Sequence, residues 1–240
     1  MIARYLFMKL LIPFLSFLIL SSFMTSDIPS SNLSKSVISK TAPRLQAAFK
    51  KKGLVYGNPI YIRIFKEEKE LELWVKKGGT FKLFKSYPIC HFSGGLGSKT
   101  KRGDHQSPEG FYYVKPNQLN PWSSFHLSFN IGYPNAYDRA KNYTGSAIMV
   151  HGNCVSIGCY AMTDDLIDEI YTIINAAFEN KQALFRVHSF PFKMTSSRLS
   201  KEKNNKWYPF WQNLKEGYDW FEKKRIPPNV EISNKKYIFN

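Results

Sequence analysis

Cysteine is scarce in this sequence, which has three in 240 residues: Cys90, Cys154 and Cys159. This number excludes the disulfide-rich class of small secreted domains. Structural zinc sites usually take paired cysteines about two to four residues apart, and Cys154, Cys159 and His151 offer no such pair, so no metal is expected. An odd number leaves at least one thiol unpaired. We expect Cys90 and Cys154 to be buried like small hydrophobic residues. Whether Cys90 or Cys154 forms a disulfide stays open, including a Cys154–Cys159 disulfide.

Acidic residues are also few. Eighteen Asp and Glu stand against 34 Lys and Arg, which gives a formal net charge of +16. Such a surplus favours an anionic partner. The sequence has no zinc finger, no helix-turn-helix pattern and no aromatic pair of the RNA-binding type, so nucleic acid is not the expected partner. Anionic wall polymers and membrane surfaces remain as candidates. The basic runs at 50–52 and 99–102 are expected to be solvated.

Long hydrophobic runs are missing after the N-terminus. Arg4 and Lys9 precede an apolar run at 10–20, and small or polar residues follow it. This pattern predicts a secretory signal peptide at 1–25, which touches the membrane only during export, and a periplasmic or cell-envelope location. An uncleaved anchor is the alternative, although the run is shorter than the roughly 20 residues of a spanning helix. No cysteine follows it directly, so a lipid anchor is not expected.

The remaining chain predicts an α+β fold that is mostly β. Alternating apolar residues predict an antiparallel meander of three strands followed by two later strands, at 60–65, 71–75, 81–84, 111–114 and 184–188. Apolar residues at helical spacing predict one helix after Thr163 and another at 207–221. A final edge strand is expected within 230–239. We divide the chain into a linker with a short helix broken near Pro43 (26–52), a catalytic domain (53–192) and a C-terminal helical and strand extension (193–240).

Two loops between these elements have compositions of interest. The glycine-rich, basic segment 93–108 is expected to be mobile, and the long segment 115–146 is expected to cover one side of a functional site. His126 lies in the second loop, where it either contacts substrate or pins the loop by a hydrogen bond. His188 is expected to be a buried structural histidine. Asp164 and Asp165 are attributed to electrostatics at a helix N-terminus.

The richest stretch for chemistry is 147–162, AIMVHGNCVSIGCYAM. A hydrophobic run ends at His151, and Cys159 follows within S-x-G-C. A free thiol is mostly protonated at neutral pH, and a nearby imidazole can take its proton and hold the resulting ion pair. Gly158 lets a substrate approach the backbone closely. The N–H groups of Gly158 and Cys159 are candidate donors to an oxyanion.

This order of residues resembles the signature of the L,D-transpeptidase (YkuD-domain) family of cell-wall enzymes, and in particular its YafK-like subgroup. Four further blocks carry the resemblance, in the expected order: 93–97, 103–112, 125–135 and 190–192. The resemblance covers roughly residues 35–240. One position departs from many members of the family, because Ala161 stands where they have an arginine.

The resemblance implies an antiparallel, sandwich-like β core with a few helices. It implies that Cys159 forms a thioester with the diaminopimelate-containing stem peptide of peptidoglycan, that His151 acts as base, and that no cofactor takes part. His126, Ser156 and Gly152 become candidate substrate contacts. The subgroup includes a member that hydrolyses peptidoglycan–lipoprotein links, so a hydrolase and a lipoprotein partner are the alternative. A non-catalytic peptidoglycan-binding scaffold is the second alternative.

Overall fold

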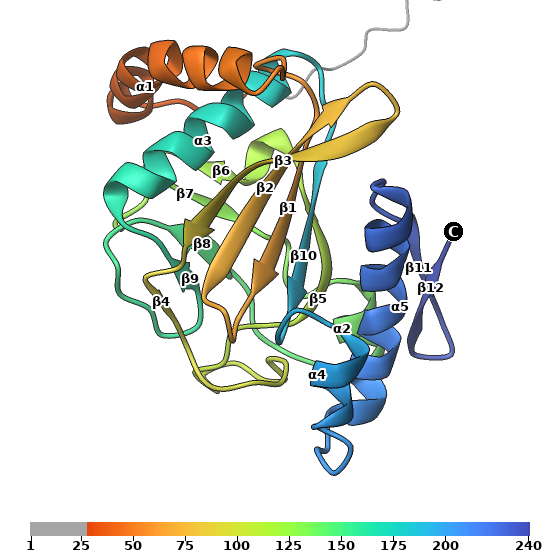
Figure 1. Ribbon diagram of the computed structural model, residues 1–240. Helices are drawn as coiled ribbons and strands as arrows, with labels where there is room; N and C mark the ends of the chain where they lie inside the picture. Colours follow the sequence, from red (N-terminus) through yellow and green to blue (C-terminus); the bar gives the residue numbers. More distant parts are fainter. Residues whose placement is uncertain (1–27) are drawn as a thin grey trace, which may run out of the picture.

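The computed structural model describes residues 28–240, in which two five-stranded sheets share one core (Figure 1). The first sheet, sheet A, has the order β3-β2-β1-β10-β5, with β1 Ile60–Phe65, β2 Glu70–Lys77, β3 Thr80–Pro88, β5 Gly110–Val114 and β10 Phe185–Phe190. The second, sheet B, has the order β4-β9-β8-β7-β6, with β4 His91–Phe92, β6 Leu119–Asn120, β7 Ser128–Asn130, β8 Met149–His151 and β9 Tyr160–Ala161. The predicted α+β, mostly β class is confirmed.

The predicted antiparallel meander is confirmed as β1–β2–β3, and two strand pairs are parallel instead. These pairs are β1–β10 and β8–β9. Tight turns connect neighbouring antiparallel strands, whereas parallel strands need a longer crossover. Local alternation therefore reveals the meander, while the β1–β10 pair joins strands that are separated by all of sheet B and by helix α3, Asp164–Glu179.

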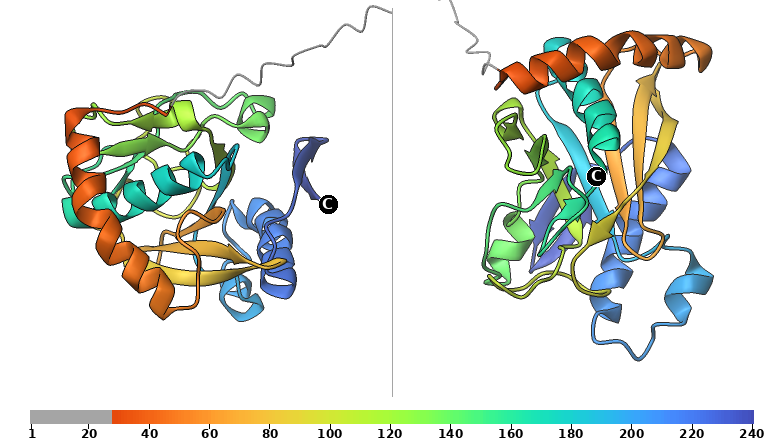
Figure 2. Two further views of the ribbon diagram at one scale, coloured as in Figure 1. Left: turned by 90° about the horizontal axis from the view of Figure 1, so that it is seen from above. Right: turned by 90° about the vertical axis from the view of Figure 1, so that its left-hand side faces the viewer.

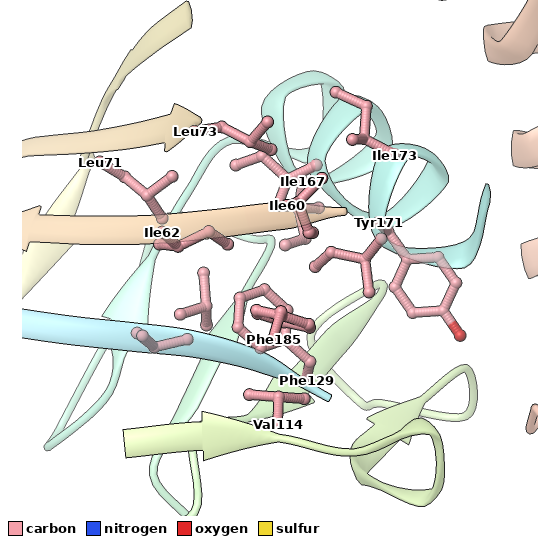
Figure 3. Close-up of a cluster of buried hydrophobic side chains, with 14 of the residues drawn as sticks. Ile60, Ile62, Leu71, Leu73, Val114, Phe129, Ile167, Tyr171, Ile173 and Phe185 are labelled. Atoms are coloured by element: carbon pink, nitrogen blue, oxygen red, sulfur yellow. The ribbon is translucent and has the colours of Figure 1, made fainter. Parts of the chain in front are cut away.

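The main core lies between sheet A, sheet B and α3. Ile62 and Leu73 of sheet A face Ile167 and Ile173 of α3, and Phe129 of β7 closes the cluster from sheet B (Figure 3). Sheet A is also covered on its other face, by α5, Tyr208–Lys224 (Figure 1). This double cover explains why every residue of β1 is buried.

Arg63 is the buried charge on that covered face of sheet A. Its guanidinium pairs with Glu72 at 2.7 Å and with Glu222 of α5 at 2.6 Å. Aromatic rings surround it, including Trp74 and Phe221 at 5.0 and 4.8 Å. A buried charge is tolerated when it is paired and hydrogen-bonded in this way. The C-terminal extension is therefore bound to sheet A by ionic as well as apolar contacts.

The N-terminal helix differs from the prediction. Helix α1 runs without a break from Asn32 to Lys51, with Pro43 inside it, and Ser31 and Ser34 form a capping box at its start. A proline inside a helix costs about 3 kcal/mol. The helix continues because one face, including Val37, Leu45 and Phe49, is buried against the core and α3. Figure 2 shows α1 running across α3.

The C-terminal segment also differs from the prediction. Residues 230–239 form a hairpin in a sheet of its own, with strands β11 Val230–Ser233 and β12 Lys236–Phe239. Asn234 and Lys235 both have a positive φ, as a two-residue hairpin turn requires. Tyr237 fixes the hairpin, since it is buried among aromatic residues of α5 and of the short helix α2, Ala136–Ala140. A further short helix, α4, spans Ser196–Ser200.

The predicted signal peptide lies at 1–25, outside the described residues. Within residues 28–240, no helix combines the length and the apolar character needed to cross a membrane.

Candidate active site

Sheet B brings His151 and Cys159 to the same face. Val150 pairs with Tyr160 in the parallel β8–β9 register, and both side chains are buried in the core. Side chains alternate along a strand, so His151 and Cys159 point to the opposite, outer face. Cys159 directly precedes β9, and its Sγ lies 3.3 Å from the backbone N of Met149 on β8. The two predicted catalytic residues are therefore diagonal neighbours on the outer face of sheet B.

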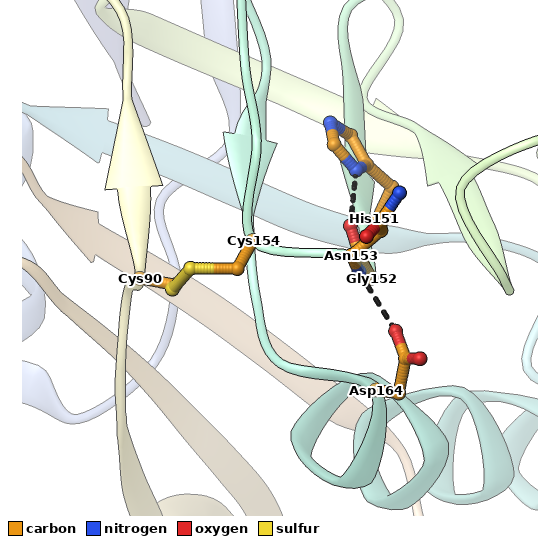
Figure 4. Close-up of a disulfide and its surroundings, with 6 residues drawn as sticks. All are labelled: Cys90, His151, Gly152, Asn153, Cys154 and Asp164. Atoms are coloured by element: carbon orange, nitrogen blue, oxygen red, sulfur yellow. Dashed lines mark hydrogen bonds between the residues drawn. A yellow bond between two sulfur atoms is a disulfide. The ribbon is translucent and has the colours of Figure 1, made fainter.

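The His151 ring is held in one tautomer. Its Nδ1 lies 2.7 Å from the carbonyl oxygen of Gly152 (Figure 4), and a carbonyl can only accept, so Nδ1 carries the proton. This leaves Nε2 as the basic nitrogen. Burial lowers the pKa of His151, although the bond to Gly152 opposes the change. The ring of Phe125 covers the imidazole at a centroid distance of 4.9 Å.

The Cys159 thiol is half-buried, and burial raises its pKa. The Met149 N–H and the Lys99 ammonium act in the opposite direction. Burial disfavours the charged form of each group, so it opposes the ion pair expected from the sequence.

Two serines hold the backbone at Cys159. Ser107 and Ser156 both donate to the Cys159 carbonyl oxygen, at 3.0 and 2.8 Å, and Ser156 also lies 3.0 Å from Ser93. The N–H of Gly158 donates to Ser156 at 3.2 Å, so it must leave this bond before it can serve an oxyanion. Ser156 thus shapes the loop that carries the nucleophile. Ser107 was missed by the sequence reasoning, which used the 103–112 block only as a mark of resemblance.

Gly152 is buried where no side chain fits. A Cβ there would overlap Asp164 Oδ1 and lie 3.0 Å from the Cβ of His126. Asp164, at the start of α3, also accepts the N–H of Asn153 at 2.7 Å (Figure 4). The acidic helix start therefore holds the loop after His151, in addition to the favourable effect of a carboxylate at a helix N-terminus. Thr163 precedes α3, but its side chain makes no capping bond.

His126 pins the loop in which it lies. Its Nε2 is 2.6 Å from Asp168 Oδ1 on α3, and its backbone has a φ of +66°. The geometry agrees with the loop-pinning interpretation, and a direct contact with substrate stays a prediction. His188 is fully buried on β10 and lies 2.7 Å from the hydroxyl of Tyr61, as a structural histidine would.

A disulfide joins Cys90 to Cys154, with the Cα atoms 5.3 Å apart and a sequence separation of 64 (Figure 4). The prediction of two unpaired, buried cysteines is wrong, because the fold brings the residue before β4 beside the loop after His151. The alternative Cys154–Cys159 pair is wrong too, since Cys159 is free. The disulfide thus braces the site and leaves the predicted nucleophile as a thiol.

The glycine-rich segment 93–108 is anchored, contrary to the expectation of a mobile loop. Buried Lys66 pairs with Glu109 at 3.0 Å and donates to the carbonyl groups of Gly97 and Ser107. Lys99 is also buried and pairs with Asp104 at 2.6 Å, so the expectation of a solvated lysine is wrong at this position. Burial of Lys66 could not be predicted, because its three partners lie 31, 41 and 43 residues away in sequence.

Within residues 28–240, no three His, Cys, Asp or Glu side chains gather where they could hold a metal ion. The site is built instead from one thiol, one imidazole and backbone dipoles. Such a set suits acyl transfer through a covalent intermediate.

Comparison with known proteins identifies the family of this chain. The family model described as the L,D-transpeptidase catalytic domain (YkuD) matches residues 59–178. YafK of Escherichia coli (strain K12) is 49% identical over 187 residues, or 78% of this chain and 76% of that protein. The YafK of Escherichia coli O157:H7 gives the same values.

Two solved structures are similar at lower identity. The helical cell shape determining protein Pgp2 of Campylobacter jejuni is 16% identical with a TM-score of 0.44, and the match covers 85% of this chain and 82% of that chain. Bd1075 of Bdellovibrio bacteriovorus is 18% identical with a TM-score of 0.41, over 74% and 78%. On the family match and the YafK identity, this chain belongs to the L,D-transpeptidase (YkuD) family.

Proposed function

We propose that this protein is a cysteine acyltransferase of the cell envelope that acts on diaminopimelate-containing stem peptides of peptidoglycan. The observation that supports the proposal is the parallel β8–β9 register, which sets His151 opposite Ala161, two residues after Cys159, together with a His151 ring whose Nε2 is the basic nitrogen. Membership in the L,D-transpeptidase family supports the substrate class. The predicted signal peptide supports export to the periplasm.

The reaction begins when Sγ of Cys159 attacks an amide carbonyl and Nε2 of His151 takes the thiol proton. The N–H of Cys159, with that of Gly158 once it is released, would stabilise the oxyanion. The amide C–N bond then breaks, the amine leaves with the proton from His151, and a thioester remains. An acceptor amine or a water molecule attacks the thioester and restores the thiol.

Of the two fates of the thioester, hydrolysis by water is favoured over transfer to an acceptor amine. Ala161, on β9, is fully buried and supplies no cation at a position where many family members have an arginine. Without a positioned acceptor, water at about 55 M competes well for the thioester. We therefore propose that the enzyme shortens stems or releases a peptidoglycan-linked lipoprotein more readily than it forms cross-links.

The test is incubation of purified protein with purified peptidoglycan, followed by liquid chromatography and mass spectrometry of the stems. We expect shortened stems as the main product, cross-linked stems only at high added amine, and a thioester adduct on Cys159. The Cys159→Ala protein is the control and should give none of these three products. Dominant cross-links at low acceptor concentration would reverse the preference for hydrolysis. Binding without turnover by the wild-type protein would support the scaffold alternative.

A further inference from the structure

A hollow lies outside the proposed catalytic site, between α2, α5 and the β11–β12 turn. Its volume is about 520 Å³. Neither His151 nor Cys159 lines it. The three elements meet there because Tyr237 of the hairpin stacks on Tyr137 of α2 at 4.5 Å, and Phe210 of α5 stacks on the same ring at 5.3 Å. The hollow is therefore a product of the C-terminal extension.

The rim of the hollow is strongly basic. Four exposed lysines line it: Lys141, Lys206, Lys235 and Lys236. Among residues 28–240, none of these four lysines is among those that form ion pairs, so the four charges have no carboxylate partner. One carboxylate, Glu216, lies in the lining. The surplus of positive charge raises the local concentration of an anionic ligand.

The wall of the hollow is aromatic and rigid. Tyr137 and Phe210 are buried within the stack, whereas Tyr143 and Trp207 are half-exposed. Gly97 packs directly against the indole ring of Trp207, so closely that any side chain at Gly97 would overlap the ring. This contact holds Trp207 in place. The face of an aromatic ring carries partial negative charge, which suits the polarised C–H bonds of a sugar ring. Gln212, on the lining, adds an amide that can both donate and accept.

The hollow is within reach of the nucleophile. Tyr143 lines the hollow, and four residues later the carbonyl oxygen of Ala147 lies 3.9 Å from Cys159 Sγ. An extended chain covers about 3.3–3.6 Å per residue, so Tyr143 is within about 20 Å of the thiol. A stem peptide of four to five residues has about the same extended reach.

We propose that this hollow binds an acidic glycan, with carboxylates at the lysine rim and sugar rings against Tyr143 and Trp207. The identification of that glycan as the strand that carries the stem peptide rests on the proposed function. Because a stem is joined to its sugar through the lactyl carboxyl group, the carboxylates at the rim belong to sugars of that strand that carry no stem. In this arrangement the hollow holds the glycan while the stem reaches Cys159. Occupancy of the hollow would favour stems attached to glycan over free peptides.

The test measures binding separately from turnover. Full-length mature protein carrying Cys159→Ala is titrated with glycan strands stripped of their peptides, whose lactyl carboxylates are free, and with neutral chitin oligosaccharides. We expect the stripped strands to bind more tightly than chitin, with an affinity that falls as salt rises. Lys206→Gln with Lys236→Gln should weaken binding by about tenfold, the effect expected for two partly exposed charge contacts. Lys50→Gln with Lys51→Gln removes the same charge from the exposed end of α1 and should leave binding unchanged.

Three outcomes would overturn the proposal. They are no binding of stripped strands, binding of chitin as tight as that of stripped strands, and an equal loss of affinity in the rim variant (Lys206 and Lys236) and in the α1 variant (Lys50 and Lys51). A turnover arm separates this failure from failure of the proposed function. With Cys159 intact, the Lys206→Gln and Lys236→Gln protein should cleave a soluble stem peptide at the wild-type rate and peptidoglycan more slowly. If the wild type cleaves neither substrate, the proposed function is wrong, and the glycan titration still decides the hollow.

Discussion

Ser107 donates from its Oγ to the carbonyl oxygen of Cys159 at 3.0 Å, across 52 residues of sequence. Ser107 is fully buried, and Ser156 donates to the same oxygen. A carbonyl held by two donors cannot turn its negative end toward the reaction centre, where it would repel a developing oxyanion. Ser107 is thus a positioning residue for the nucleophile.

Ser107→Ala should slow acylation of Cys159 by an activated ester by about tenfold, because one hydrogen bond of about 1–1.5 kcal/mol is lost. Alkylation by iodoacetamide forms no oxyanion and should keep its rate. Ser107→Thr, which retains the hydroxyl, should recover part of the acylation rate. Ser146→Ala, at an exposed serine near the site, is the matched control. Equal losses in acylation and alkylation would show that Ser107 only keeps the loop folded.

Removal of the Cys90–Cys154 disulfide should lower the free energy of unfolding by about 2–5 kcal/mol, because a crosslink over 64 residues restricts the unfolded chain. Denaturant titration of Cys90→Ala with Cys154→Ala measures the change. Reductant should destabilise the wild type and leave this variant unaffected. Thiol counting on denatured protein should find one thiol without reductant and three with it. Three thiols without reductant would contradict the disulfide.

Lys99→Gln should raise the pKa of Cys159. The Lys99 ammonium stabilises the thiolate against the effect of burial, so its loss leaves burial less opposed. The measurement is the rate of iodoacetamide alkylation against pH, whose midpoint should move upward. Lys99→Arg keeps the charge and should keep the midpoint, and Lys101→Gln, at an exposed lysine, is the control. Superimposable profiles for Lys99→Gln and wild type would remove Lys99 from the electrostatics of the thiol.

Asp138→Asn should stabilise the protein at pH 8. Burial raises the pKa of Asp138 to about 7. A carboxyl whose pKa is raised on folding favours the folded state below its unfolded pKa of about 4, and this contribution disappears as the pH rises through about 7. Tyr112 and Asn135 both donate to Oδ2, whereas Oδ1 has no partner, so an asparagine keeps both accepted bonds.

The free energy of unfolding of the wild type should therefore fall relative to Asp138→Asn between about pH 4 and 7, by roughly 2–4 kcal/mol. Urea titrations across this range measure the difference. Parallel stability curves for the two proteins would show that Asp138 does not titrate in the folded state near neutral pH.

Elements with strong local patterns could be predicted from the sequence. The alternation in β1 and β2, and the apolar stripe of α3, depend only on neighbouring residues. Helix α1 continues through Pro43 because contacts with α3 offset the cost of the proline. The residues around Pro43 do not reveal these contacts, since α3 is far away in sequence. The β11–β12 turn has no glycine, although Asn234 and Lys235 both adopt a left-handed backbone. Its sequence therefore indicates a hairpin turn only weakly.

The residue types alone identify the chemical groups of the candidate site, which are a thiol, an imidazole and the glycine at 158, whereas the pKa values of the thiol and the imidazole depend on burial in the fold. It also determined the class of secondary structure, through the period of its apolar residues. The folded structure is needed to show which cysteines pair, that Ser107 meets Cys159, which nitrogen of His151 is basic and that Lys99 is buried. The first two features join groups that are 64 and 52 residues apart in sequence and become neighbours only in the folded chain. The other two involve partners close in sequence, Gly152 and Asp104, but the backbone conformation that aligns each pair and the burial of Lys99 exist only after folding.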